Sequence, residues 1–351
     1  MFQPDYKNTN KIVEMLTDIA EAKSVIERAR LLPKQELKLR RQALIRMSHS
    51  STAIEGNILN AKEVEAIVAN KKIDAPDRDV YEVKNYLNAL RYIEQVVKTK
   101  KPITEKVVLK IHQLVTDKTM KATSSGHFRK GLVHVVKKHF GGRVEVIYTG
   151  PEAKLVPGLM ADLLAWVQAS EKENISPIIV AGVVHQQIAA IHPFSDGNGR
   201  TARALATLIL YQRGYDFRRL FALEDYYNTD RPAYYAAINI GKNWEVRRTD
   251  FTSWLQYFVK GFKEEIAQVK HSVVSLSVKK IDADIDSQVY LDKEQVTILD
   301  FLDTMQKIAV SDVMDILRCP KRTAQLHLQK LKKLKMIKQV GKGPASKYVL
   351  A

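Results

Sequence analysis

The twelve residues from His192 to Arg203 contain most of the groups that a reaction on a nucleotide phosphate needs. His192 titrates near neutral pH, so its imidazole can take a proton from an attacking hydroxyl. Asp196 is a hard oxygen ligand of the kind that Mg²⁺ prefers. Arg200 and Arg203 lie three positions apart and can bind phosphate oxygens through forked hydrogen bonds. These residue types at this spacing predict metal-assisted chemistry at a phosphate.

A glycine-rich loop, Gly197-Asn198-Gly199, separates the histidine from the arginines. Glycine lets the backbone approach a ligand closely, and successive amides in such a loop form an anion-binding nest. The helix predicted at 177–191 should end near His192, because proline restricts the residue before it. A second helix begins near Gly199, and its N-terminal amides favour a phosphate. The alternative is a capped turn with a purely structural role; Phe194 is a core residue in either case.

The residues from His192 to Arg203 match the pattern H-x-F-x-[D/E]-G-N-G-R-x-x-R at every specified position, and the chain therefore resembles the Fic family. The resemblance implies a mainly α-helical fold and the transfer of a nucleoside monophosphate, usually AMP from ATP, to a hydroxyl group of a target protein. It implies that His192 is the general base and that Asp196 holds Mg²⁺. In-line attack at phosphorus depends on positioning and charge stabilisation, which suits this set of residues.

The same resemblance assigns the nucleotide contacts. Gly197, Asn198 and Gly199 would bind the α- and β-phosphates, and Arg200 and Arg203 the β- and γ-phosphates. These contacts are made mainly to phosphates, so the loop does not fix the base, and a donor nucleotide other than ATP is an open alternative.

Two further segments resemble the family. Gly126-His127-Phe128-Arg129 leads into a predicted hairpin of 132–136 with 144–148 around Gly141-Gly142, which resembles the flap that aligns a target backbone by strand addition. The alternative is an ordinary surface hairpin. The segment 226–239 resembles the family's adenine-side segment, and Tyr235 is its candidate base contact. Adjacent tyrosines on a helix are also typical of a core edge.

An upstream motif predicts a built-in inhibitor. Ser51, Glu55 and Gly56 occupy the fixed positions of the family's inhibitory pattern [S/T]-x-x-x-E-[G/N]. The resemblance implies that Glu55 pairs with Arg203 and so removes the γ-phosphate clamp, because an arginine–carboxylate fork can rival a phosphate. In some relatives this glutamate also supports the removal of AMP. The alternative is that Glu55 simply ends a helix before a Gly-Asn turn.

Composition bounds the remaining function classes. The net charge of +17 and the pI near 9.6 favour polyanionic partners such as nucleotides, nucleic acids or acidic proteins. Cys319 is the single cysteine, which favours a reducing compartment. The sequence has no secretory leader pattern and no apolar run of membrane-spanning length. We therefore expect a cytoplasmic protein that does not bind a membrane. No P-loop or dinucleotide-binding glycine motif is found.

Hydrophobic periodicity predicts helices for most of the chain. The chain divides into four predicted regions. We expect an N-terminal helical region with the inhibitory motif at 1–100, a Fic-type helical bundle with its small flap hairpin at 101–278, a linker at 279–292 and a winged helix-turn-helix domain at 293–351. The linker is acidic and irregular, with alternating aspartates at 282, 284 and 286.

The C-terminal region is strongly cationic, with ten Lys or Arg and no Asp or Glu from Arg318 onwards. Helices at 296–305, 310–317 and 321–334, followed by two short strands around Gly341, resemble a winged helix-turn-helix. Four polar residues share one face of the third helix and are candidates for reading duplex DNA: Arg322, Gln325, Gln329 and Lys333. The alternative is a winged helix for protein docking or homodimer formation.

Two functions of different classes follow. The first is an auto-inhibited, Mg²⁺-dependent protein adenylyltransferase that uses ATP, and the intact signature favours it. The second is a DNA-binding regulator whose Fic domain senses nucleotide without turnover. Salt-dependent duplex binding without label transfer would indicate the second.

Overall fold

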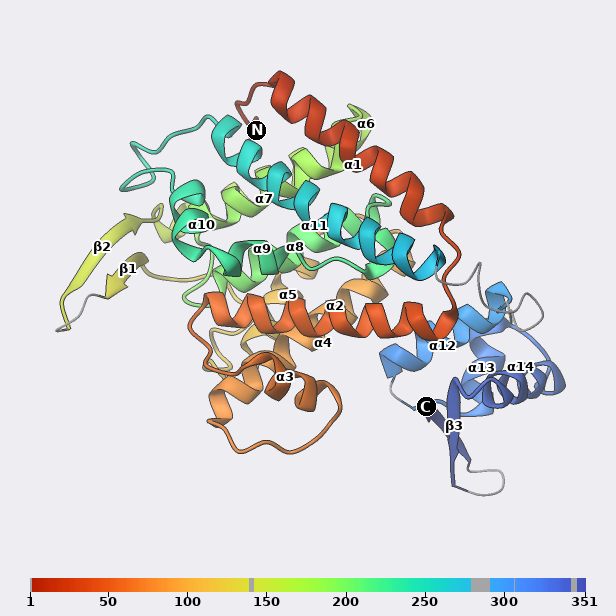
Figure 1. The fold of residues 1–351 in the computed structure, drawn as a ribbon. Coiled ribbons are helices and arrows are strands. Elements are labelled where there is room, and N and C mark those ends of the chain that lie inside the picture. Colours follow the sequence, from red (N-terminus) through yellow and green to blue (C-terminus); the bar gives the residue numbers. More distant parts are fainter. Residues whose placement is uncertain (1, 139–141, 279–290, 306, 342–345) are drawn as a thin grey trace. The chain divides into compact units, whose positions relative to one another are not determined.

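The computed structural model describes residues 2–138, 142–278, 291–305, 307–341 and 346–351, and it confirms a mainly α-helical fold with two small hairpins (Figure 1). The helices and strands follow in this order: α1 Asn10–Arg28, α2 Pro33–Ile54, α3 Ala61–Val68, α4 Asp77–Thr99, α5 Glu105–Thr116, β1 His134–Lys138, β2 Val144–Thr149, η1 Ala153–Leu155, α6 Val156–Lys172, α7 Pro177–Ile191, α8 Asn198–Gln212, η2 Phe217–Arg219, α9 Leu223–Thr229, α10 Arg231–Ile238, α11 Thr252–Val278, α12 Lys293–Met305, α13 Val310–Leu317, α14 Lys321–Lys333, β3 Ile337–Val340 and β4 Lys347–Leu350.

The chain divides into two compact units. One contains Met1–Ala29 with Arg40–Val274, and the other contains Arg30–Leu39 with Ser275–Ala351. Most of the regions predicted at 1–100 and 101–278 therefore lie in one unit, whereas residues 30–39 and 275–278 belong to the other. The predicted domain boundaries themselves stay a prediction. The linker at 279–290, Gly141 and the turn at 342–345 lie outside the described residues.

Helices α7 and α8 form the centre of the first unit. In α7 every residue except Pro177 and Ala189 is buried, as expected for a helix that is apolar on all sides. Helix α11 packs tightly against it, because a Cβ atom at Gly182 would lie 2.8 Å from the Leu255 side chain. The indole of Trp254 on α11 donates a 2.7 Å hydrogen bond to the Gly182 carbonyl. Helices α4 and α5 contact α8, whose N-terminus follows the loop from α7.

The predicted flap is an antiparallel hairpin of β1 and β2, which projects from the helical bundle in Figure 1. Its first strand begins at His134, two residues later than the sequence predicts, and the register shifts between Val135 and Val136. Tyr148 on β2 is buried, and its hydroxyl donates to the Ala190 carbonyl at 2.8 Å. This contact fixes the base of the hairpin to the end of α7.

The C-terminal unit has the predicted order of three helices and an antiparallel hairpin, β3 with β4. Ala324, Leu328 and Leu331 of α14 are buried in its core, against which Leu37 of α2 also packs. The four candidate DNA-reading side chains on α14 are all exposed: Arg322, Gln325, Gln329 and Lys333. Binding to DNA stays a prediction. Within the described part of the chain, no helix is both long and apolar enough to cross a bilayer.

Candidate active site

His192 ends α7 in a left-handed backbone conformation, with φ 49° and ψ 57°. This conformation costs a non-glycine residue roughly 1–2 kcal/mol, so surrounding contacts must hold it. The His192 amide donates to the Ile188 carbonyl at 2.9 Å. Its ring Nδ1 lies 3.3 Å from the Ala189 carbonyl oxygen, which only accepts hydrogen bonds. Nδ1 therefore carries the proton, and Nε2 keeps a free lone pair.

The imidazole is neutral at physiological pH. Burial lowers the pKa of His192 below its usual value, and the carbonyl of Ala189 only partly offsets this shift. A neutral ring with a free Nε2 is the form that a general base requires.

Arg129 connects the base of the flap to this histidine. Its guanidinium is 5% exposed and donates from Nε to the His192 carbonyl at 2.8 Å. It also donates to the carbonyls of Gly131 at 2.7 Å and Pro151 at 2.6 Å. The sequence places Arg129 beside the flap but does not show that it supports the strained backbone of His192.

The loop after the histidine is closed by the Asn198 side chain. Its Oδ1 accepts from the Phe194 amide at 2.9 Å, and its Nδ2 donates to the Phe194 carbonyl at 2.9 Å. Phe194 is fully buried, as the sequence predicts for a core anchor. The Asn198 side chain therefore shapes the loop, while its backbone amide belongs to the first turn of α8.

We expect Asn198→Ala to lower the free energy of unfolding by about 2–3 kcal/mol, because both backbone groups of buried Phe194 lose their partner. Denaturant titration measures the change. Ser195→Ala, in the exposed part of the same loop, is the matched control and should change stability by less than about 0.5 kcal/mol. Equal stability of the two variants would contradict this role of Asn198.

His112 of α5 packs against the loop between α7 and α8. Its ring stacks on Phe194 with centroids 3.7 Å apart. Its Nδ1 accepts from the Gly126 amide at 2.9 Å, so Nε2 carries the proton and donates to the Asp196 carbonyl at 3.0 Å. Burial lowers the pKa of His112 to about 4. The sequence does not single out this residue, because nothing local links it to a loop 80 positions away.

This pKa predicts a loss of stability in acid. A histidine whose pKa is depressed in the folded state contributes its full stability above its unfolded pKa near 6.5 and loses it as the pH falls toward about 4. We expect His112 to account for about 2 kcal/mol of lost unfolding free energy at pH 5 relative to pH 7.5. His112→Gln keeps a donor to Asp196 without titrating, so it should show a shallower pH dependence in denaturant titrations; an unchanged slope would rule out this assignment.

The glycines of the loop make room for close contacts. Gly197 has φ 76°, and a Cβ atom there would lie 2.7 Å from the Thr116 side chain. A Cβ atom at Gly199 would collide with Oε1 of Glu55 and lie 3.0 Å from Arg203 Nη1. The Glu55 carboxylate therefore lies directly on the Gly199 backbone in the first turn of α8, which is where an anion is favoured.

Arg203 is the main partner of this carboxylate. Its side chain is 1% exposed, and its Nη2 lies 2.7 Å from Glu55 Oε1. Nε also donates to Ser51 Oγ at 2.9 Å, and Nη2 to the Ser51 carbonyl at 2.8 Å. Burial alone would lower the pKa of Arg203, but Glu55 raises it above its ordinary value. All three inhibitory-motif positions are used, because Gly56 takes φ 97° in the turn that follows.

A buried polar cluster that the sequence does not reveal lies next to Arg203. Glu224 is 2% exposed, and the Tyr86 hydroxyl donates to its Oε1 at 2.7 Å. Burial raises the pKa of Glu224 to about 7, although Tyr86 and Arg203 lower it. A carboxyl group that changes charge near neutral pH therefore interacts with the predicted phosphate clamp.

The neighbouring tyrosines of α10, Tyr234 and Tyr235, differ in burial. Tyr234 is buried, whereas Tyr235 is 48% exposed. The Tyr235 hydroxyl donates to the Ile54 carbonyl at 2.8 Å, next to Glu55. The candidate base contact is thus placed beside the inhibitory segment, and its contact with a nucleotide stays a prediction.

Asp196 is the candidate metal ligand. Its side chain is 48% exposed and lies between two arginines, with Arg78 Nη2 at 3.7 Å and Arg200 Nη2 at 3.6 Å. In the part of the chain that the structure describes, no group of three or more His, Cys, Asp or Glu side chains is arranged to hold a metal. Mg²⁺ commonly takes one or two carboxylates and completes its shell with phosphate and water oxygens. The accessible carboxylate of Asp196 fits that use.

The central pair of buried helices, α7 and α8, is joined by a glycine-rich loop with a histidine at one end and arginines at the other. Residues 102–210, about a third of the chain, match the Fic/DOC family. Its match with Protein adenylyltransferase Fic of Drosophila virilis is 28% identical over 204 residues, 58% of this chain and 38% of that protein. The protein of the same name from Culex quinquefasciatus is 31% identical over 178 residues, 50% of this chain and 33% of that protein. The chain thus spans less than half the length of these relatives.

Solved structures share the fold. A Fic family protein from Desulfovibrio desulfuricans G20 has a TM-score of 0.63 at 24% identity, over 100% of this chain and 98% of that chain. Fic-1 from C. elegans has a TM-score of 0.58 at 21% identity, over 77% of this chain and 74% of that chain. These likenesses support the helical architecture of the Fic domain.

Proposed function

We propose that the chain is a protein adenylyltransferase that transfers AMP from ATP to a hydroxyl side chain of a target protein. The observation that carries the proposal is the position of the Glu55 carboxylate against Gly199 and Arg203. A carboxylate bound there supports an anion site close to the neutral His192. The names of the relatives that match the Fic domain agree with this reaction.

The proposed reaction gives each of these groups a role. The target hydroxyl oxygen forms a bond to the α-phosphorus, and the bond from that phosphorus to the bridging oxygen of the β-phosphate breaks. His192 Nε2 takes the hydroxyl proton, and pyrophosphate leaves. The α8 amides and the two arginines stabilise the phosphate charge. Mg²⁺ on Asp196 would supply additional neutralisation of phosphate oxygens.

The Glu55–Arg203 ion pair is the proposed inhibitor. Its carboxylate takes the position and the arginine that a terminal phosphate would use, so ATP must displace it to bind productively. Reverse removal of AMP, supported by the same glutamate, belongs to the same proposal as a second activity.

The flap is the proposed docking surface for the target. A two-stranded sheet leaves backbone edges open for strand addition, and Val136, Val144 and Val146 are exposed apolar side chains on it. A target segment paired with the hairpin would present its hydroxyl to the end of α7, where Tyr148 fixes the hairpin base.

The test compares label positions. The Glu55→Gly chain is incubated with Mg²⁺ and cell-extract proteins, once with ATP labelled at the α-phosphate and once at the γ-phosphate. AMP transfer predicts protein-bound α-label and no γ-label; γ-label on protein would indicate a kinase. An excess of unlabelled GTP or CTP that removes the α-label would indicate a donor other than ATP. Nucleotide binding without any label transfer would favour the nucleotide-sensing regulator.

A further inference from the structure

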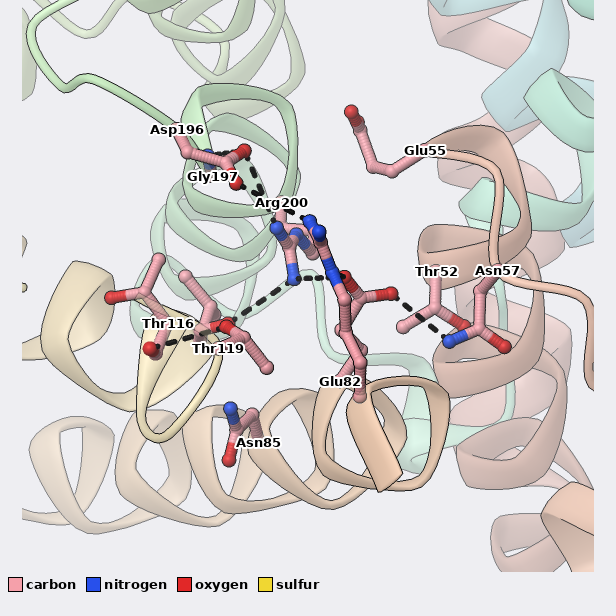
Figure 2. A network of polar contacts seen from close by, with 12 residues as sticks. Thr52, Glu55, Asn57, Glu82, Asn85, Thr116, Thr119, Asp196, Gly197 and Arg200 are labelled. Atoms are coloured by element: carbon pink, nitrogen blue, oxygen red, sulfur yellow. Dashed lines mark hydrogen bonds and ion pairs between the residues drawn. The ribbon is translucent and has the colours of Figure 1, made fainter. Parts of the chain in front are cut away.

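Glu82 of α4 is a buried carboxylate outside both sequence motifs. It is 6% exposed, and its carboxylate lies between the Arg200 guanidinium and the Asn57 amide (Figure 2). A buried acidic side chain needs compensating partners. The two oxygens contact different parts of the candidate active site.

One oxygen contacts arginines. Glu82 Oε1 lies 3.6 Å from Arg200 Nη1 and 3.2 Å from Arg78 Nε. Arg200 is 2% exposed, and it also contacts the Val115 carbonyl at 3.3 Å and the half-exposed Asp196. A buried guanidinium is costly without a nearby anion. Among the described residues that contact Arg200, Glu82 is the buried carboxylate.

The other oxygen contacts the turn that follows Glu55. Glu82 Oε2 accepts from Asn57 Nδ2 at 3.0 Å, and the same amide group donates to the Asp79 carbonyl on α4 at 3.0 Å. Asn57 is 8% exposed and follows Gly56, whose φ of 97° sharpens the turn. The end of the inhibitory segment is therefore fastened to α4 through the Asn57 side chain.

We propose that Glu82 is a positioning residue that joins the phosphate clamp to the inhibitory turn. Through Oε1 it holds Arg200 toward the phosphate site, and through Oε2 it holds Asn57 so that Glu55 stays on Gly199. This inference rests on the proposed transferase function. It implies that the effect of Glu82 on nucleotide binding and its effect on inhibition can be separated with different variants.

The chain offers variants that make this separation. Glu82→Gln keeps an oxygen for Asn57 but loses the charge that compensates Arg200, so it should weaken nucleotide binding. Asn57→Ala removes the link to the turn and leaves the Glu82–Arg200 pair, so it should weaken inhibition. Asn85→Ala is the matched control, because Asn85 is a buried amide of the same helix α4 whose hydrogen bond goes to the Asp117 carbonyl instead.

The experiment measures initial rates of AMP transfer against ATP concentration, together with the dissociation constant of ATP from calorimetry. In the Glu55→Gly background we expect Glu82→Gln to raise KM and the dissociation constant about tenfold with kcat changed less than about threefold, and Asn85→Ala to change neither. With Glu55 present, Asn57→Ala should raise the basal rate about fivefold and should have no effect once Glu55 is glycine.

Two results would overturn the inference: unchanged ATP affinity in Glu82→Gln, or Asn57→Ala acting equally with and without Glu55. Failure of the proposed function looks different. A Glu55→Gly chain that binds ATP but transfers no AMP would remove the transferase proposal, while an ATP affinity weakened by Glu82→Gln and not by Asn85→Ala would still establish the positioning of Arg200.

Discussion

Replacing Glu55 by glycine is expected to raise the rate of AMP transfer by about 10- to 100-fold. The 2.7 Å contact between Glu55 Oε1 and Arg203 Nη2 is charge-assisted, and breaking it frees both the arginine and the backbone of Gly199. Hydrogen bonds to charged groups contribute about 1.5–3 kcal/mol, which corresponds to this range of rates if ATP must displace the carboxylate before it binds productively. Initial rates with α-labelled ATP measure the change.

Controls separate the loss of charge from the loss of a side chain. Glu55→Gln keeps the shape but not the charge and should give intermediate activation. Glu65→Ala changes an exposed glutamate of α3 and should leave the rate unchanged. Glu55 follows the last residue of α2, so a glycine there does not interrupt a helix. Equal rates for wild type and Glu55→Gly, with both chains folded, would contradict the inhibitory role.

The same variant should also respond more strongly to nucleotide in thermal unfolding. Without Glu55 the buried Arg203 loses its carboxylate partner, so the apo protein should lose about 2 kcal/mol of stability. A ligand that binds the folded state restores stability in proportion to its concentration over its dissociation constant. ATP should therefore raise the Tm of Glu55→Gly by more than that of wild type.

Local sequence signals predicted the catalytic loop well because its residues act over short distances. Pro193 ends α7, glycines shape the turn, and α8 begins within one residue of its predicted start. The backbone conformation of the segment from His192 to Arg203 is therefore determined mainly by its own residues. The pairing of Glu55 with Arg203 spans 148 positions and was predictable only through the resemblance to the family.

The supporting residues were not predictable because their roles depend on tertiary contacts. Arg129, His112 and Glu82 are common residue types, and each acts on a residue far away in the chain. Of the three, only Arg129 stands next to a segment that the sequence singles out, the predicted flap. Only packing shows that Glu82 is buried between Arg200 and Asn57.

The membership of residues 30–39 in the C-terminal unit was also not predicted. The segment mixes leucines with charged residues and includes the start of α2, and its Leu37 packs against the core around Leu328. The four leucines of this segment, at positions 31, 32, 37 and 39, do not repeat at a helical spacing, so the sequence pattern does not show which core they join.

Replacing His192 by alanine in the active Glu55→Gly background is expected to reduce AMP transfer by about 10³-fold, within the 10²- to 10⁴-fold range of general base catalysis. The hydrogen bond geometry leaves Nε2 free, and burial lowers the pKa of His192, so the ring is already a base at pH 7. ATP affinity should change little, because the proposed phosphate contacts are made by α8 and its arginines and not by His192. A fall in kcat with an unchanged dissociation constant for ATP is therefore the specific expectation.

The pH profile supplies a second test of the same role. Because the pKa of His192 lies below its usual 6.5, kcat in the Glu55→Gly background should be constant from pH 8 to about 6.5 and should fall only in more acidic solution. His271→Ala changes an exposed histidine of α11 and should leave both rate and profile unchanged. If His192→Ala kept more than about a tenth of the rate, the target hydroxyl would not need this base, and the loop would act by phosphate binding alone.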